Sequence, residues 1–401
     1  MCVRKKKRRV FTHGNMDLDA NASVFAWRQV DPDAELVLVS ANWDGTGMEK
    51  DDVALDIEAG DRGIKGTVMA DGVRHSAFAE IVAKHLKRKA REQLAPLVAF
   101  IDAQDTFGDA YEYLAPNASP STREMLSSTG INAVLRALQT VLREDRAVHE
   151  RMSEIFAGMQ QAIVLPNAPL MLARMAMQWL VRTYPRTRLT DGDFETRVIR
   201  HCPTEDTQAL IPFIAFIKLC ETNPPVSLLA SVVPREALPV LEATSLVGVF
   251  RALVAVHGEG ATLEERMFQL FDGLIQNGIK RLYAQHEARE TPIMAGRVAI
   301  LEEPKYSGTS LALIRHHGVD AVVYKRGNNI GVRSRKGLHI WMDHPLIREA
   351  VGSEPDWFFH PEGFLAARGT RKAPSMSPSK IDPVHLALAV LRALESADAG
   401  D

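Results

Sequence analysis

Short apolar runs separated by polar turns open the chain, and their periods predict strands that alternate with helices. Residues 10–11 are typical of the end of a buried strand, and residues 20–27 carry apolar side chains at helical spacing. Residues 35–43 and 51–60 have the pattern of two further strands. Because strands that alternate with helices pair in parallel, we expect an open α/β sheet in this part of the chain.

Longer apolar patterns follow. Residues 70–86 predict a turn that opens into a helix, and residues 94–110 are compatible with either a helix or a strand. From about residue 110 to 290, stripes of Met, Leu and Ala predict helices. The last hundred residues predict a separate α/β unit, with a hairpin that turns at residues 327–329 and a closing helix.

The predicted fold class is therefore α/β, with a helical region between two sheet-containing parts. Turn-forming clusters at residues 116–121, 221–225 and 289–296 are strong candidate boundaries. The first and last of these clusters predict a parallel-sheet N-terminal domain at 1–115, a helical insertion at 116–295 and a smaller C-terminal α/β domain at 296–401.

The helical region contains an internal echo. Residues 128–159 align without gaps on residues 243–274, with about a dozen identical positions. Residues 94–106 resemble 210–222 in a register shifted by one residue. The alternatives are a duplicated unit and two amphipathic segments that share Ala, Leu and Arg by composition.

Composition excludes several classes of protein. The chain has 401 residues, 46% hydrophobic and 24% charged, and no apolar run reaches the roughly 18 residues that span a bilayer. Three distant cysteines, Cys2, Cys202 and Cys220, predict neither a disulfide framework nor a thiolate metal cluster, so we expect a reducing, cytoplasmic location and no membrane. A net charge of −2 gives no general nucleic-acid signature. The basic residues 4–9 are either an arm that attracts phosphate polymers or a solvated lead-in to the first strand.

Candidate chemistry begins between the first strand and the first helix, where His13, Asp17 and Asp19 share one short turn. Loops at the carboxyl ends of parallel strands are where open α/β sheets usually bind ligands. An imidazole with carboxylates suits a first-row divalent ion, Mn²⁺ rather than Ca²⁺. The alternative is an Asp-rich turn in which Asp19 caps the helix and His13 is incidental.

The same order of an apolar element followed by His or Asp recurs in the next hundred residues. Asp56 follows the third strand, His75 lies in the turn before a helix, and Asp105 ends the apolar segment that follows. Asp56 leaves its strand toward the edge that carries the first loop, so it could bridge two ions.

Basic groups mark the last part of the chain. Alternation along the hairpin places Arg333 and Arg335 on one face, a fork suited to phosphate, with Lys336 beside them. His360 precedes a flexible glycine, Gly363, which suits close approach of a phosphate. The alternative for the arginines is an exposed edge strand protected by charge.

These motifs, taken in order, resemble the four motifs of the DHH phosphoesterase superfamily. The first has the form H-x-x-x-D-x-D-A-x-x-S at 13–23, and Asp56, His75 and Asp105 with Thr106 stand for the others. The phrases VFTHGNMDLDANAS, FIDAQDTFGD and WFFHPEGFLAARGTRKA are most similar to the melanocyte-proliferating-gene-one (Myg) exonuclease group. The third motif departs from the pattern, because adjacent Asp-His-His is replaced by Val73, Arg74 and His75, or by Asp71 and His75 if a short insertion is allowed.

The resemblance implies two divalent ions, expected to be Mn²⁺ with Mg²⁺ or Co²⁺ as alternatives. It implies one ion on His13, Asp17 and Asp56, and another on Asp19, Asp56, His75 and Asp105. It assigns phosphate contact or catalysis to His75, Arg74 and His360, and substrate binding to Arg333, Arg335, Lys336 and Gly363. The segment with Arg335 and Lys336 is similar to the Ser-Arg-Lys phosphate site of class II pyrophosphatases.

The expected function is that of a metal-dependent phosphoesterase, a 3′-to-5′ exonuclease or oligonucleotide hydrolase, with its site in the cleft between the two α/β domains. The expected partner is RNA, a short oligonucleotide or a nucleotide, and a homodimer is compatible with these patterns. Two alternatives stay open because the third motif is incomplete: a nucleotide- or RNA-binding pseudoenzyme, and a phosphoesterase for a dinucleotide or pyrophosphate.

Overall fold

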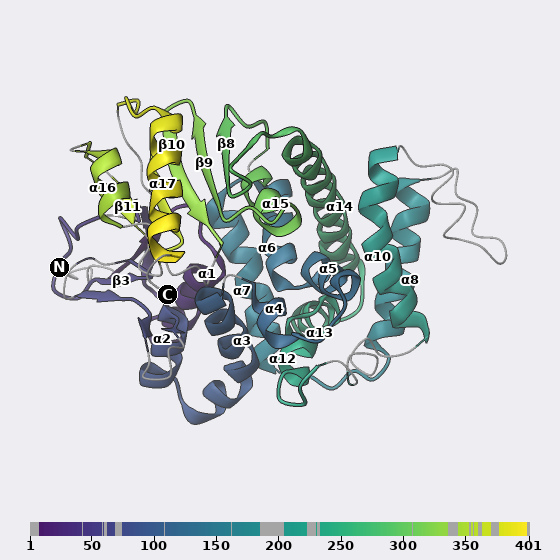
Figure 1. Cartoon of the computed structure of the whole chain (residues 1–401). Helices are drawn as coiled ribbons and strands as arrows, with labels where there is room; N and C mark the ends of the chain where they lie inside the picture. Colours follow the sequence, from purple (N-terminus) through teal and green to yellow (C-terminus); the bar gives the residue numbers. More distant parts are fainter. Residues whose placement is uncertain are drawn as a thin grey trace. The chain divides into compact units, whose positions relative to one another are not determined.

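The computed structural model describes most of the chain, in the ranges 8–41, 43–57, 59, 62–68, 74–107, 109–161, 163–184, 204–222, 230, 233–306, 308–335, 344–352, 354–355, 357–359, 363–369 and 377–398. It divides into two compact units. The first contains residues 1–39 and 43–279, and the second contains 40–42 and 280–401. Residues 1–39 and 43–115 and the predicted helical region up to residue 279 lie in the first unit, and the end of that helical region lies in the second. Figure 1 shows the elements of the chain, coloured along the sequence.

A four-stranded parallel sheet begins the first unit, in the order β2-β1-β3-β4. Its strands are β1 (Arg9–His13), β2 (Glu35–Val39), β3 (Val53–Leu55) and β4 (Gly63–Ile64). Phe11 of β1 is buried with Ala54 of β3 and Ile57, and it stacks on Trp43 at 4.6 Å between ring centroids. The parallel sheet expected from the alternating pattern is confirmed.

Most of the other described residues of the first unit are helical. They are α1 (Leu18–Val30), α2 (Ala77–His85), α3 (Arg88–Phe107), α4 (Ala110–Leu114), α5 (Pro120–Thr129), α6 (Ile131–Leu142), α7 (Asp145–Gln161), α8 (Ala168–Thr183), α10 (Thr204–Thr222), α12 (Leu238–Thr244), α13 (Leu246–His257) and most of α14 (Ala261–Glu290). A small antiparallel pair, β5 (Thr67–Val68) and β6 (Arg74–His75), precedes α2. Most of residues 94–110, for which the sequence allowed either a helix or a strand, belong to the helix α3.

Contacts within the helical region repeat in the register of the sequence echo. An antiparallel bridge joins Gly130 to Ser245, which are equivalent positions in the two aligned segments. A Cβ added to Gly158 would lie 2.0 Å from the carbonyl oxygen of Ala252, and one added to Gly273 would lie 2.6 Å from that of Ala137. Gly158 is equivalent to Gly273, and Ala137 to Ala252. Each of the two aligned segments therefore places a glycine against the carbonyl oxygen of an alanine in the other segment, at equivalent positions.

The second unit is a six-stranded mixed sheet in the order β11-β12-β10-β9-β8-β7. Its strands are β7 (Ile293–Met294), β8 (Val298–Glu302), β9 (Ala321–Arg326), β10 (Asn329–Ser334), β11 (Phe358–Phe359) and β12 (Leu365–Arg368), and its helices are α15 (Thr309–His316), α16 (Pro345–Val351) and α17 (Pro383–Asp398). One apolar cluster joins the sheet to α16 and α17, and another joins it to α15 and Ala288 of α14. The predicted hairpin is β9–β10, with Gly327 at φ +55° in its turn.

The parallel sheet of the first unit, the mixed sheet of the second and the many helices confirm the α/β class. No helix among the described residues has the length and apolar character needed to cross a bilayer.

Candidate metal site

The first candidate loop is shaped by the end of β1 and the start of α1. His13 is the last residue of β1, and Asp17 is the N-cap of α1, where its Oδ1 accepts a hydrogen bond from the backbone N–H of Ala20 at 3.1 Å. The alternative that made Asp19 the cap is wrong in this detail, because Asp19 lies inside the first turn of α1. Asn15, at φ +55°, turns the chain between the strand and the helix.

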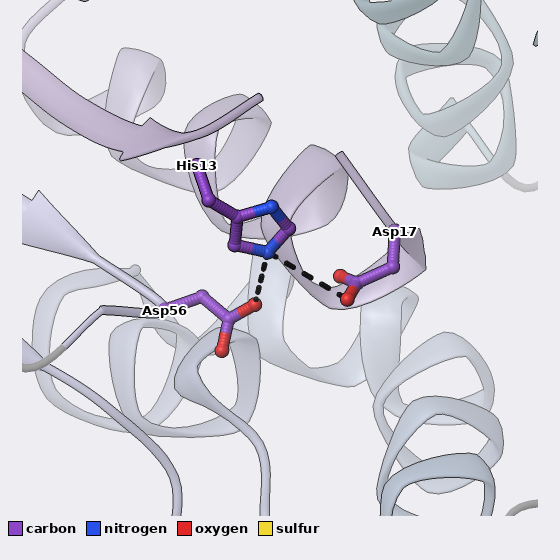
Figure 2. Close-up of side chains that lie close together, drawn as sticks. All are labelled: His13, Asp17 and Asp56. Atoms are coloured by element: carbon purple, nitrogen blue, oxygen red, sulfur yellow. Dashed lines mark hydrogen bonds and ion pairs between the residues drawn. The ribbon is translucent and has the colours of Figure 1, made fainter. Parts of the chain in front are cut away.

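Three predicted ligands come together at the carboxyl end of this sheet. The Nε2 atom of His13 lies 3.1 Å from Oδ2 of Asp56 and 3.6 Å from Oδ2 of Asp17 (Figure 2). One ligand atom from each residue lies within 4.8 Å of the others. The imidazole is 2% exposed, while the Asp17 and Asp56 side chains are 45% and 19% exposed, so the group faces solvent on its carboxylate side.

The backbone of Asp56 explains how its carboxylate reaches this position. Asp56 follows β3 with φ at +56°, in the left-handed region, and its N–H donates to the Ile64 carbonyl oxygen at 2.8 Å. This conformation ends the strand at Leu55, inside the run of residues 51–60 that the sequence predicted to be extended.

The donor set fits a divalent ion. Nδ1 of His13 lies 3.0 Å from the carbonyl oxygen of Gly14, which can only accept a hydrogen bond. With its proton on Nδ1, the ring turns the Nε2 lone pair toward two carboxylates, and that arrangement is repulsive without a proton or a cation between them. One imidazole nitrogen and two carboxylate oxygens are ligands that first-row divalent ions accept.

Asp19 lies near this group but has other partners. Its carboxylate is buried and accepts from the backbone N–H groups of Ala77 (3.0 Å) and Phe78 (2.8 Å) and from Ser23 Oγ (3.2 Å). Burial raises the pKa of Asp19 well above its usual value, and the charges of Asp56, Asp105 and Asp17 raise it further. Several carboxylates thus share one small volume, and that concentration of negative charge favours a cation.

His75 lies at the end of β6, and its side chain is 41% exposed. Its Nδ1 lies 2.9 Å from Oδ2 of Asp102 on α3. Asp102 is buried, and its Oδ1 accepts from the backbone N–H of Ser76 at 2.8 Å and from Ser76 Oγ at 2.7 Å. His75 and Asp105 are outside the group formed by His13, Asp17 and Asp56 among the described residues, so their roles as ligands stay predictions.

Two arginines of the second unit were predicted to bind substrate, and their side chains lie in different electrostatic environments. Arg335 follows β10, and its Nη2 is paired with Asp320 Oδ1 at 3.0 Å, while Arg297 Nε takes the other oxygen at 2.6 Å. Arg333 lies in β10, where burial and the charge of Arg315 lower its pKa. Arg335 is therefore paired with a carboxylate, whereas Arg333 is buried near another cation, Arg315.

Other predicted groups fall partly or wholly outside the described part of the chain. Lys336, His360 and the side chain of Arg74 are outside the described residues. Gly363 is described and has φ at +68°, which suits glycine. The roles of these residues stay predictions.

Sequence reasoning did not select Asp102 as a site residue. The signal was available, because Asp102 stands among the apolar residues of a helix face and a buried carboxylate requires hydrogen-bond partners. The sequence alone could not identify His75 and Ser76 as those partners, because their position beside α3 depends on the tertiary fold.

Neither protein-family models nor curated protein sequences match this chain. Among solved structures, the pGpG-specific phosphodiesterase PggH from Vibrio cholerae is similar over 98% of this chain and 99% of its own, with 8% identity and a TM-score of 0.39. RecJ from Thermus thermophilus, solved with Mg²⁺ and with Mn²⁺, gives 13% identity and a TM-score of 0.32. Our chain spans about half the length of those RecJ chains, 50% and 52%.

Proposed function

We propose that this protein is a phosphoesterase that depends on a divalent metal ion and hydrolyses phosphodiester bonds in short oligonucleotides. The observation that carries the proposal is the convergence of His13 Nε2 with the carboxylates of Asp17 and Asp56. The order of the sequence motifs supports the phosphoester class. A nucleotide-binding protein without hydrolytic activity is the second reading, motivated by the incomplete third motif.

Each residue has a distinct part in this proposal. His13, Asp17 and Asp56 would hold the ion, which when bound supplies Lewis acidity toward a phosphate and toward water. Asp19 holds the N-terminus of α2 against the loop through Ala77 and Phe78. His75, whose side chain is 41% exposed, would contact the substrate or a second ion.

The first prediction concerns metal binding. Replacing both Asp17 and Asp56 by Asn removes two charges that the ion would neutralise, so Mn²⁺ affinity should fall by more than the roughly 10–100-fold that the loss of an outer partner costs. Isothermal calorimetry on the full chain measures this. Asp33→Asn, an exposed carboxylate in the turn after α1, is the matched control and should bind as the wild type does.

Cleavage assays on the wild type and the double variant test whether the protein hydrolyses phosphoesters. Wild type with Mn²⁺ should shorten a 5′-labelled oligoribonucleotide, and chelation or the double substitution should abolish the cleavage. A dinucleotide and pyrophosphate, assayed beside it, separate a polymer substrate from a small one. Mn²⁺ binding without cleavage of any of the three would favour the binding protein, and equal Mn²⁺ binding by wild type and double variant would remove this group as a metal site.

A further inference from the structure

We infer that Asp102 is a positioning residue: it fixes the ring orientation and tautomer of His75 so that Nε2 faces outward as an electron-pair donor. The inference rests on the proposed function in one respect: the ligand of Nε2 would be a metal ion or a phosphate group. The orientation itself is a property of the metal-free protein.

Asp102 is well placed for this task because both of its oxygens are engaged. Oδ1 accepts two hydrogen bonds from Ser76, one from its N–H and one from its hydroxyl, and Oδ2 faces His75 Nδ1 at 2.9 Å. Rotation of the carboxylate would break the Ser76 contacts. The group is 6% exposed, so water cannot easily replace a lost partner.

The carboxylate also decides which ring nitrogen carries the proton. An ionised carboxylate only accepts, so the neutral ring donates from Nδ1 and keeps the lone pair on Nε2. Such a carboxylate–histidine pair fixes the tautomer of a metal-binding imidazole and strengthens it as a ligand. The His75 side chain is 41% exposed, so a ligand can reach part of the ring.

A purely structural role would give a different pattern of effects. Ser76 caps α2, since its Oγ accepts from the N–H of Ala79 at 3.1 Å, and Asp102 could exist only to support that cap. Ser76→Ala removes the hydroxyl contact and leaves the His75 contact in place. It should lower stability without changing the His75 tautomer, and is therefore the matched control for Asp102→Asn.

The test uses the full-length, metal-free chain with ¹⁵N-labelled histidine. Long-range ¹H–¹⁵N correlation spectra at a pH where the ring is neutral report the tautomer, and His75→Gln assigns the signal. We expect the Nδ1–H tautomer in wild type and in Ser76→Ala, and a mixture or the Nε2–H form in Asp102→Asn, whose amide can donate to Nδ1. We also expect Asp102→Asn to bind Mn²⁺ about 10–100-fold more weakly than Ser76→Ala.

The outcomes separate this inference from the proposed function. Loss of the Nδ1–H tautomer in Asp102→Asn supports the positioning role even if the wild type binds no Mn²⁺, and that failure of the wild type would refute the metal-dependent function alone. An unchanged tautomer in Asp102→Asn refutes the positioning role even if phosphoesters are cleaved. If Asp102→Asn does not fold, the wild-type spectrum alone decides, because an Nε2–H tautomer for His75 there overturns the inference.

Discussion

A buried imidazole in α7, that of His149, connects the helical region to the candidate metal loop. Its Nδ1 lies 3.3 Å from Asn21 Oδ1, and the Asn21 amide donates to the carbonyl oxygens of Met16 (3.0 Å) and Asp17 (2.8 Å). Burial, and then the charge of Arg28, lower the pKa of His149 to about 4. The ring is therefore neutral in the folded protein at neutral pH.

This depressed pKa predicts acid sensitivity. In the unfolded chain a histidine takes up a proton near pH 6.5, whereas folded His149 resists it until about pH 4. The stability that the neutral ring contributes is complete above pH 6.5 and is lost as pH falls through this window, by about 3 kcal/mol in total. Urea unfolding at several pH values measures the loss.

His149→Gln, which does not titrate and keeps hydrogen-bonding capacity, should show a shallower fall in stability over the same window. His286→Gln, at a histidine whose side chain is 71% exposed, serves as the control and should follow wild type. Identical pH profiles for His149→Gln and wild type would show that His149 is not the group responsible.

At the scale of helices and strands, local pattern predicted the elements better than their ends. The apolar helical face of α2 is buried as expected, including Phe78 and Ile81. The third strand is shorter than predicted because the left-handed backbone at Asp56 ends it. The pattern of apolar and polar residues carries no information on a single backbone dihedral angle, so this end could not be predicted. The His13, Asp17 and Asp56 group was predictable from motif order, whereas the contacts of Asp19 and Asp102 arise from helices distant in sequence.

Duplication of the helical unit stays a prediction, and the reciprocal glycine contacts make it testable. Gly158→Ala and Gly273→Ala should each destabilise the protein by about 1–3 kcal/mol, because the new methyl meets a backbone oxygen that cannot move freely. Losses of similar size at the two positions are what a duplicated contact predicts. Chemical denaturation gives both values.

Gly278→Ala in α14 is the matched control. Its Cβ would meet the Cβ of Ala209 at 3.1 Å rather than a carbonyl oxygen, so a smaller loss is expected. If only one of Gly158→Ala and Gly273→Ala destabilises the chain, the two contacts are not equivalent and the case for duplication weakens.

At the scale of the whole molecule, the helical region supports the loop that carries the candidate ligands. Asp145 Oδ2 accepts from the N–H of Asn15 at 2.8 Å, and Gln139 Nε2 donates to the carbonyl oxygen of Met16 at 3.1 Å. Phe25 of α1 packs against Phe156 of α7, with 5.5 Å between ring centroids. These contacts lie inside one compact unit.

The last prediction follows from this support. A fragment of residues 1–115 should lack a cooperative thermal transition, because it exposes the apolar face of α1 and loses the partners of Asn15 and Met16. A fragment of residues 1–279 should fold and bind Mn²⁺. Circular dichroism and calorimetry compare the two, and a shorter fragment that folds cooperatively and binds Mn²⁺ as the full chain does would show that the helices are dispensable.

The left-handed backbone at Asp56 limits how this protein can change over evolutionary time. Few side chains accept such a conformation without strain, and asparagine and glycine are foremost among them. Both can be reached from aspartate by a single-nucleotide change, and both keep the turn while removing the negative charge. A single substitution at this position would therefore leave a folded scaffold that, under the proposed function, holds a metal ion less tightly.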